Sequence, residues 1–206
     1  MTAISYIQDI YIKIIFECGL TDVVETIFSN ACRQNIVEVK RVLKIIPPYF
    51  HSQLLNFNSF SNACRERTIE IMEFIWNLAN QNIKNTLIEN TFPICLINAI
   101  KLGERAIINK LLNWLNPNQQ LSCLAYEEYN SFVYAADRGY LDILEIIYEI
   151  LPHSVLLKAI SASNFAAYRL AIKNKHTDVV LFLERISSPD QIKKMKKAVN
   201  QSIIPK

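Results

Sequence analysis

An alanine that returns at a nearly constant spacing constrains this chain more than any other feature of its sequence. The alanines are Ala31, Ala63, Ala99, Ala135 and Ala171, so the successive steps are 32, 36, 36 and 36 residues. Self-similarity at a fixed period of about 20–50 residues is the signature of a repeat architecture, in which each unit covers its apolar face with the next unit. The spacing therefore predicts an array of similar units rather than a single folded pocket.

Three further rows of residues keep the same register as the alanines. A bulky residue stands three positions before each alanine, an aliphatic residue eight positions after it, and a second aliphatic residue four positions further on. The rows are Phe28, Phe60, Leu96, Phe132 and Tyr168; Val39, Ile71, Ile107, Ile143 and Val179; and Leu43, Ile75, Leu111, Ile147 and Leu183. Residues three or four apart share one face of a helix. We predict that each unit is an antiparallel helix pair and that these rows, with the alanines, form its core.

Polar breaks and prolines set the expected helix boundaries, because a proline often follows the last turn of a helix. The expected pairs are 21–34 with 37–46, 54–66 with 69–78, 91–102 with 105–115, 127–138 with 141–151, and 164–174 with 177–186. The segments between pairs are too long and too apolar for simple turns, so each is predicted to hold a short extra helix. The turn inside each pair falls at Asn35, Arg67, Gly103, Gly139 and Lys175.

A capping helix is expected at each side of the repeats. Residues 1–20 carry the first, a helix over 3–18 with Ile4, Ile7, Tyr11, Ile14 and Ile15 along one side. Residues 187–206 carry the second, a helix over 189–201 with Ile192, Met195 and Val199 facing inward. The predicted fold is thus an all-α solenoid of about five helix pairs, in one domain over 1–206 with its repeats over 21–186.

Charge and cysteine content narrow the function classes. The net charge is +3, but 187–206 holds five lysines and Asp190, or +4, which leaves a body of −1. A near-neutral body gives no nucleic-acid signal, so binding of nucleic acid or of an anionic membrane would have to use the basic tail.

The five cysteines are an odd number without metal-ligand spacing. Cys32 and Cys64 follow the alanines directly, which predicts core thiols and a reducing, cytoplasmic location. No metal or other cofactor is expected.

The N-terminus and the hydropathy profile argue against export or membrane insertion. The opening residues, MTAISYIQDIYIK, lack a basic leader and a small-residue cleavage site. No apolar run approaches the about 20 residues that span a bilayer. Both observations favour the cytoplasmic location.

The repeat resembles a known family in its last two units. Residues 135–147, AADRGYLDILEII, and 175–184, KHTDVVLFLE, resemble the ankyrin repeat, in which an alanine pair precedes Gly-His-Leu-Asp/Glu-Val-Val and a leucine run. The resemblance covers about residues 28–186. It departs from the family in lacking a Thr-Pro-Leu-His opening, in keeping the turn glycine only at Gly103 and Gly139, and in a period longer than about 33 residues.

The resemblance implies a role as well as a fold. The phrase ISASNFAAYRLAIKNKHTDVV is similar to degenerate ankyrin arrays in effectors that intracellular bacteria deliver into host cells. It implies protein–protein binding, a host-cytoplasmic location after delivery, short helices in place of the inter-repeat fingers, and no catalytic residue. His176 takes the ankyrin position after the turn, where a structural hydrogen bond is usual.

Candidate partner-binding residues follow from rows of charge beside the alanines. Two residues after each alanine stand Arg33, Arg65, Lys101, Asp137 and Lys173. Stacked units would align these residues into a basic stripe interrupted by one acid. An acidic row, Glu38, Glu70, Asp142 and Asp178, begins the second helices. Cations are favoured at the C-terminal ends of helices and anions at the N-terminal ends. The alternative interpretation is therefore that the two rows only stabilise helix termini and pair with each other, without binding a partner.

An aromatic cluster adds possible anchors to the stripe. Tyr126, Tyr129 and Tyr134 surround Glu127 and Glu128 before the fourth alanine, and Arg138 follows it. Tyrosine is favoured at interfaces, although these residues would serve equally in capping a helix. The predicted partner-binding set is Arg33, Arg65, Lys101, Tyr129, Tyr134, Asp137, Arg138 and Lys173. A third row, Asn30, Asn62 and Asn98, is expected to be buried and to hydrogen-bond between units.

We predict a non-enzymatic module that binds a protein with an acidic or mixed apolar surface and no small-molecule substrate. Two alternatives stay open. One is an enzyme, or an enzyme inhibitor, whose site lacks a recognisable motif. The other is a binder of anionic membranes or nucleic acid through the lysines of the tail. A Cys–His hydrolase needs a thiol in contact with an imidazole, and the cysteines in the repeat register are core candidates instead.

Overall fold

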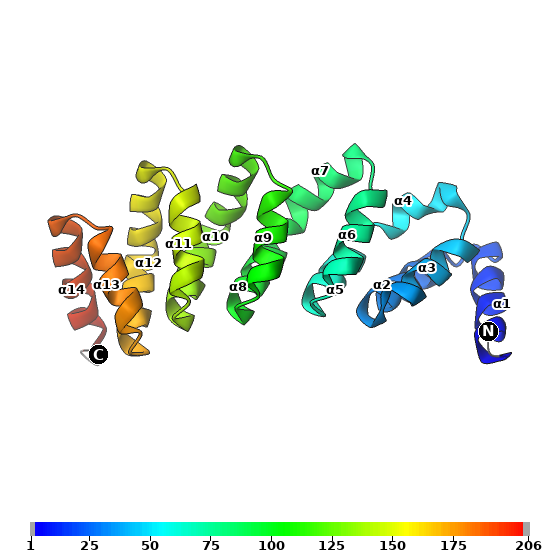
Figure 1. Ribbon diagram of the computed structural model, residues 1–206, viewed down its shortest axis with the longest axis horizontal. Helices are drawn as coiled ribbons and strands as arrows, with labels where there is room; N and C mark the ends of the chain where they lie inside the picture. The colour runs from blue at the N-terminus through cyan, green and yellow to red at the C-terminus, as the bar shows by residue number, and fades with distance from the viewer. Residues whose placement is uncertain (1–2, 204–206) are drawn as a thin grey trace. The chain divides into compact units, whose positions relative to one another are not determined.

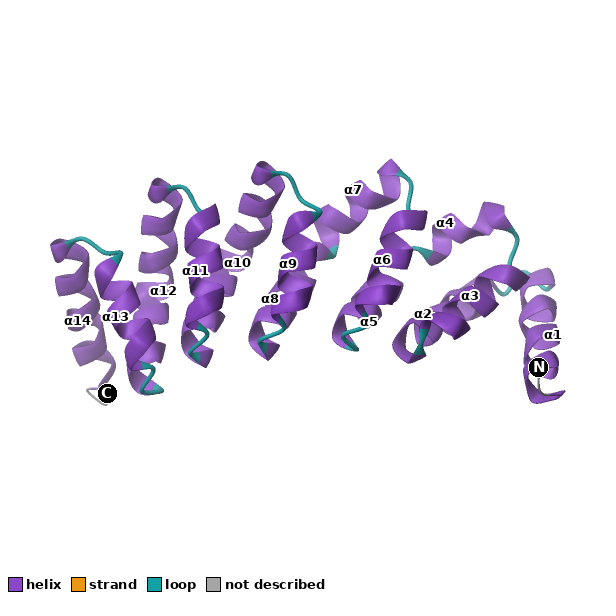
Figure 2. Cartoon of the chain, viewed as in Figure 1, coloured by secondary structure: helices purple, strands orange, loops and turns teal. Residues whose placement is uncertain are grey.

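The computed structural model describes residues 3–203, and the side chains of residues 8–201. These residues form fourteen α-helices and one short 3-10 helix, and no strand is found among them (Figure 1, Figure 2). The all-α expectation is therefore confirmed. The chain divides into two compact units, residues 1–95 and 96–206, which are described separately below.

The first unit holds seven α-helices and the 3-10 helix, and the eighth α-helix leads out of it. In order these are α1 (Ala3–Glu17), α2 (Thr21–Gln34), α3 (Ile36–Ile45), η1 (Pro48–Phe50), α4 (His51–Leu54), α5 (Phe57–Arg65), α6 (Ile69–Leu78), α7 (Gln81–Asn90) and α8 (Phe92–Leu102). Helix α2 packs against α3 and α5, and α5 packs against α6. The extra helices expected in the connectors are present as α4 and α7.

The second unit continues with six helices after the end of α8. These are α9 (Arg105–Asn113), α10 (Pro117–Arg138), α11 (Leu141–Ile150), α12 (His153–Lys173), α13 (Thr177–Arg185) and α14 (Pro189–Ile203). Helices α10 and α12 pack along each other, α11 packs against α10 and α13, and α14 packs against α12, as Figure 1 shows for this unit. Most of the predicted helices end within two residues of the observed ones.

The core follows the predicted rows without exception. All four rows, including the five alanines, are buried, and the most accessible of the twenty residues is Leu43 at 8%. Phe28, Phe60 and Phe132 are completely inaccessible to solvent. Each of these helices thus buries one apolar face inside its unit, and the residues on its opposite side lie at the surface.

The turn after each of four alanines has one geometry. Arg67, Gly103, Gly139 and Lys175 all have a left-handed backbone, with φ between 62° and 75°. The next residue in each case donates its N–H to the carbonyl of the row alanine, as Tyr140 does to Ala135 at 2.9 Å. This is the bond of a Schellman helix end. The expected turn at Asn35 differs, because Asn35 is extended and its side chain caps α3 by accepting from the N–H of Glu38.

Three expected helix starts are too early. The helix predicted from residue 54 begins at Phe57, because Leu54 ends the connector helix α4. In the other two cases the connector helix and the following helix are joined by a left-handed break. Glu127, Glu128 and Tyr129 have φ of 47°, 57° and 65° inside α10. The same break recurs 36 residues later inside α12, at Ser163, Asn164 and Phe165. Regular helix therefore resumes at residues 130 and 166, rather than at the predicted 127 and 164.

The apolar side predicted for α1 is not the side that packs inward. Tyr11 and Ile14 are exposed by 63% and 49%, whereas Ile12 is buried at 4%. Phe16 turns toward η1 and lies edge-on to Phe50 with ring centroids 5.1 Å apart. Arg41 of α3 fixes the helix by an ion pair of 2.6 Å to Asp9. The side chains of Ile4 and Ile7 lie outside the described residues. In α14, the inward position predicted for Met195 is confirmed, because this side chain is fully buried.

Candidate interaction surface

The predicted cationic residues of the first unit share one carboxylate. Arg33 ends α2 and Arg65 ends α5, and both lie on the exposed side of these helices. Glu66 Oε1 is 3.4 Å from Arg33 Nε and 3.7 Å from Arg65 Nε. Arg65 also donates to Asn62 Oδ1 at 2.6 Å. Two guanidinium groups against one carboxylate leave this cluster with a positive charge that is exposed to solvent and screened by it.

In the second unit the structure brings Lys101 and Tyr134 together. The ammonium nitrogen of Lys101 lies 4.1 Å from the centre of the Tyr134 ring. Both side chains are half-buried, so the ring is held in place and still reaches the surface. A cation over an aromatic face contributes about 0.5–1 kcal/mol at an exposed site. The pair presents a positive charge and an aromatic edge in a fixed arrangement.

Asp137 has a structural role that its position in the basic row did not reveal. Asn174 donates its side-chain amide to both the carboxylate and the main-chain carbonyl of Asp137, at 2.8 Å each. His176 Nε2 lies 3.0 Å from the same carbonyl, which confirms the hydrogen bond expected for this histidine. Arg138 Nε is 4.0 Å from the carboxylate. The acid is therefore held by hydrogen bonds that join the end of α10 to the turn before α13.

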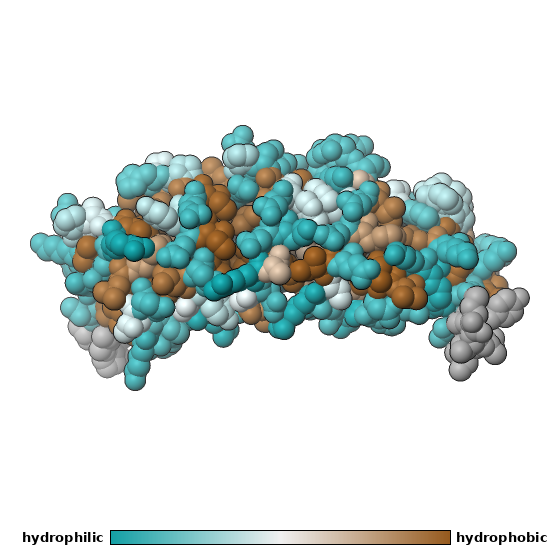
Figure 3. Space-filling view, in the orientation of Figure 1, coloured by the Kyte–Doolittle hydropathy of each residue, from teal (hydrophilic) through white to brown (hydrophobic). Residues whose placement is uncertain are grey.

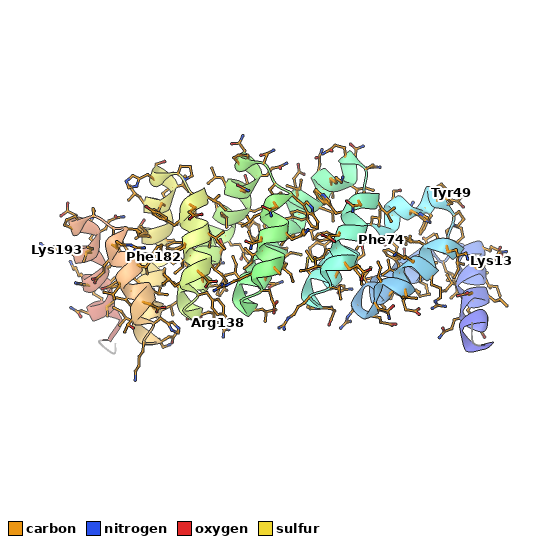
Figure 4. The ribbon with its side chains drawn as sticks, viewed as in Figure 1. Lys13, Tyr49, Phe74, Arg138, Phe182 and Lys193 are labelled. Atoms are coloured by element: carbon orange, nitrogen blue, oxygen red, sulfur yellow. The ribbon has the colours of Figure 1, made fainter. Side chains whose placement is uncertain are left out.

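The remaining predicted partner-binding residues lie near the ends of α10 and α12 or at the break inside α10. Arg138 is exposed at the end of α10, where Figure 4 shows it beside the turn into α11. Lys173 is exposed at the same place in α12. Tyr129 lies at the opposite end, in the left-handed break of α10, and is half-buried. The breaks in α10 and α12 contact each other, since Ser163 Oγ donates to Glu128 at 3.4 Å.

The ion pairs found for the acidic row do not join it to the basic row, as the alternative interpretation had expected. Glu38 pairs with Arg41 at 2.6 Å, and Asp142 pairs with Arg105. Both cations are outside the predicted basic row. These two ion pairs thus join first-turn acids to partners one helix turn away or on a neighbouring helix, and neither of the two acids pairs with a cation of the basic row.

The asparagine row is only partly buried. Asn62 donates to the main-chain oxygen of Ser29 at 3.1 Å and to its hydroxyl at 2.7 Å, which confirms the expected bond between α5 and α2. Asn30 and Asn98 are exposed, so the expectation of burial is wrong for them. Their amides are available at the surface.

A groove beside α2 and α5 was missed by the sequence reasoning. It has a volume of about 380 Å³ and is lined by Asp22, Glu25, Thr26, Ser29, Asn30 and Asn58. Asp22, Thr26 and Asn30 are spaced by four residues and form one polar stripe of α2. That stripe was a readable signal, but the helix was read only for its apolar side.

The cysteines and histidines that could support catalysis have the following surroundings among the described side chains. Burial raises the pKa of the Cys32 thiol to about 12 and that of Cys123 to about 11, so both remain protonated near neutral pH. His51 Nε2 lies 3.0 Å and 2.8 Å from the carbonyls of Leu43 and Ile46, where it covers the open end of α3. Within the described residues, no group of three His, Cys, Asp or Glu side chains is placed to hold a metal ion.

One helix, α12, is long and apolar enough to cross a membrane by length and composition alone. This outcome differs from the expectation that no segment would pass such a test. The helix is interrupted at Ala162–Phe165 and packs along α10. The core helix of a soluble domain passes the same test, so the finding alone does not assign a membrane span.

Comparison with protein-family models, with curated proteins and with solved structures finds no match for this chain.

Proposed function

We propose that this chain is a non-enzymatic, ankyrin-like solenoid that binds another protein through the exposed side of α2, α5, α8, α10 and α12. The observation that carries the proposal is the burial of all twenty row residues at their repeating positions. The four identical turns add to it, because the same hydrogen bond returns after each alanine from Ala63 onward. Helix pairs that bury the same face leave the same opposite face exposed, and repeat proteins bind partners through such exposed faces.

The proposed partner is a protein with an acidic, partly apolar surface. Lys101 of α8 and Tyr134 of α10 form the centre of the site in the second unit, and the exposed Arg138 and Lys173 end α10 and α12. Arg33 and Arg65 supply a further cationic cluster in the first unit. Aromatic anchors carry most of the binding free energy at interfaces, whereas exposed charges mainly set the association rate and its dependence on salt.

The resemblance to effector arrays extends the proposal to the host cytoplasm as the place of action. Under this proposal the buried thiols fit a reducing compartment, where unpaired cysteines persist as small core residues. An enzyme with an unrecognised site is less well supported, because Cys32 and Cys64 are buried and their thiols resist ionisation.

The test begins with a pull-down that identifies a partner and continues with binding kinetics on the purified pair. Tyr134→Ala should raise the dissociation rate at least about tenfold, as expected for a hot-spot aromatic worth more than about 1.4 kcal/mol. Arg65→Glu combined with Lys101→Glu should lower the association rate mainly at low salt. Tyr148→Ala is the matched control, because Tyr148 is an exposed tyrosine on α11, away from the proposed face.

A wild-type affinity in the Tyr134 variant and in the charge variant would show that the partner uses another face. The basic helix α14 is the principal competing site. Its Lys193 points away from α13 in Figure 4, and Lys196 is 3.2 Å from Glu184. Replacing Lys193, Lys194, Lys196 and Lys197 by Gln should leave partner binding unchanged. Anionic liposomes or nucleic acid that bind the wild type and not this variant would favour the tail instead.

A further inference from the structure

Two apolar patches lie outside the surface proposed above. The first, here the N-face, comprises exposed side chains of α1, of the turn after it and of the start of α2. They are Ile10, Tyr11, Ile14, Leu20 and Val23, with exposed fractions from 41% to 63%. The second, the C-face, is a groove of about 590 Å³ on α12 and α13, lined by Ala171, Ile172, Lys175, Thr177, Val180 and Leu181. Hydrophobic atoms gather over α13 in Figure 3.

The C-face resembles a helix contact that is made elsewhere in the same unit. Ala136 and Leu144 stand 36 residues before Ile172 and Val180, and both are completely buried. They belong to α10 and α11, against which α12 and α13 pack. Helix α14 packs against α12, yet Ile172 remains 36% exposed. The C-face therefore has the composition of a covered repeat surface and is open among the described residues.

Leu181 gives an independent sign that this surface receives a partner. It is 66% exposed, and the residues that take its place in the four earlier pairs are all polar. Those residues are Arg41, Glu73, Asn109 and Glu145. The position therefore does not need an apolar side chain for the core of the chain itself. A large exposed leucine next to an apolar groove is typical of an interaction site.

The N-face is apolar where a polar surface would be expected. Ile12 is the residue of α1 that packs inward, whereas Tyr11 and Ile14 lie outside. The outer helix of a repeat array usually carries polar residues on its free side, since nothing else keeps that side soluble. The exposed Ile10, Tyr11 and Ile14 are three or four residues apart and share one side of α1 instead.

The charges around the two patches are of opposite sign. At the N-face Glu17, Asp22 and Glu25 outnumber Lys13, which lies 3.8 Å from Glu17 on the same helix. At the C-face the exposed Lys173 and Lys175 outnumber the exposed Asp178, so the net charges of the two rims are opposite. Asp22 also stands in its helix where Asp142 stands in α11, and Asp142 forms an ion pair with Arg105 of the preceding helix pair. An acid at this position thus already serves as the link from one pair to the previous pair inside the chain.

We propose that the N-face of one copy of this chain docks into the C-face of a second copy. The contact continues the packing by which α12 and α13 cover α10 and α11, with the acidic rim of one copy against the basic rim of the other. Because two different patches meet, the contact is heterologous, and each added copy leaves one face of each kind open. The chain therefore associates head to tail into stacks whose length rises with concentration.

The experiment measures the mass of the full chain in solution over a wide concentration range, by sedimentation equilibrium or by light scattering. Wild type should rise above the 23.8 kDa of a single chain as concentration increases. Leu181→Glu closes the C-face without a folding penalty, since glutamate is native at the equivalent Glu73 and Glu145. Tyr11→Lys closes the N-face, and Leu78→Lys is the control on an exposed leucine outside both faces.

Each single-face variant should remain at 23.8 kDa, and a 1:1 mixture of the two should give a species of twice that mass and no larger one. The mixture succeeds because one variant retains the C-face and the other retains the N-face. The Leu78 variant should behave as wild type. A wild type that stays monomeric at every concentration overturns the proposal. Self-association that persists in either single-face variant overturns it too, because the two faces are then not both required.

Discussion

Replacing Phe132 by alanine tests the register on which the whole reading of the fold depends. Phe132 is completely buried in the second half of α10, which packs against α11 and α12. Burying a phenylalanine side chain contributes about 1.5–3 kcal/mol by transfer alone, and the cavity left by the ring adds to the loss. We expect Phe132→Ala to lower the free energy of unfolding by about 3–5 kcal/mol.

Urea unfolding followed by far-UV circular dichroism measures this loss. If the free energy of unfolding falls by about 2 kcal/mol per molar urea, the urea concentration at the unfolding midpoint should fall by about 1.5–2.5 M. Trp114 lies in the same unit as Phe132 and Trp76 in the other, so a Trp76→Phe background reports the affected unit alone by fluorescence. The control is Tyr148→Ala, which removes a ring that is 44% exposed and makes one edge-on contact with Phe182.

The control should cost no more than about 1 kcal/mol, the usual contribution of a single aromatic pair. A loss below about 1 kcal/mol for Phe132→Ala, or one equal to that of the control, would refute the reasoning, because a ring at the centre of a packed core cannot be removed so cheaply.

Three further predictions concern side chains that the core encloses. Ser131→Ala removes a buried hydroxyl that donates at 2.8 Å to a helix-end carbonyl, and should cost about 1–3 kcal/mol in the same urea assay. A thiol reagent should label Cys18 quickly in the native protein and Cys32 only in denaturant, since Cys18 alone of the five cysteines is exposed; rapid native labelling of Cys32 would contradict its placement. Tyr168 donates to Glu184 at 2.6 Å, and this bond, followed by the one from Lys196, lowers the pKa of Glu184 below its ordinary 4.5. A depressed carboxyl pKa contributes stability above 4.5 that is lost as pH falls, so Tyr168→Phe should destabilise the protein at pH 7 and converge with wild type in acid, as thermal unfolding at several pH values would show.

The core was predictable because its signal is local and repeated. Each row residue is fixed by a spacing of three, eight or twelve positions from an alanine, and five copies of the pattern agree with one another. Helix α1 offers no such agreement. Isoleucine stands at 10, 12, 14 and 15, almost all round the helix, so periodicity cannot select the side that packs inward. The choice is made by Asp9 and Phe16, whose partners lie on α3 and η1.

The candidate site was predictable in its positions but not in its pairings. Spacing alone put Lys101 and Tyr134 on exposed sides of their helices, but only the structure brings the ammonium over the ring. The hydrogen bond that Asn174 donates to Asp137 likewise depends on how two helix ends meet, 37 residues apart in sequence. The left-handed breaks had no signal at all, because Glu127 to Tyr129 contain no glycine, the residue that usually marks such a backbone.

The left-handed turns also restrict how such a chain can gain or lose units. A side chain on Gly139 would begin with a Cβ only 2.6 Å from the imidazole of His176, and one on Gly103 would begin 2.9 Å from the ring of Tyr140. Each glycine is therefore matched to a ring that belongs to the following helix pair. If an internal pair is deleted or duplicated by recombination, the new junction must again join a glycine to a ring, or a larger turn residue to a smaller neighbour. Loss of the pair between Gly103 and Gly139, for example, would place Gly103 against His176, so a glycine would again meet a ring wherever the two breakpoints fell.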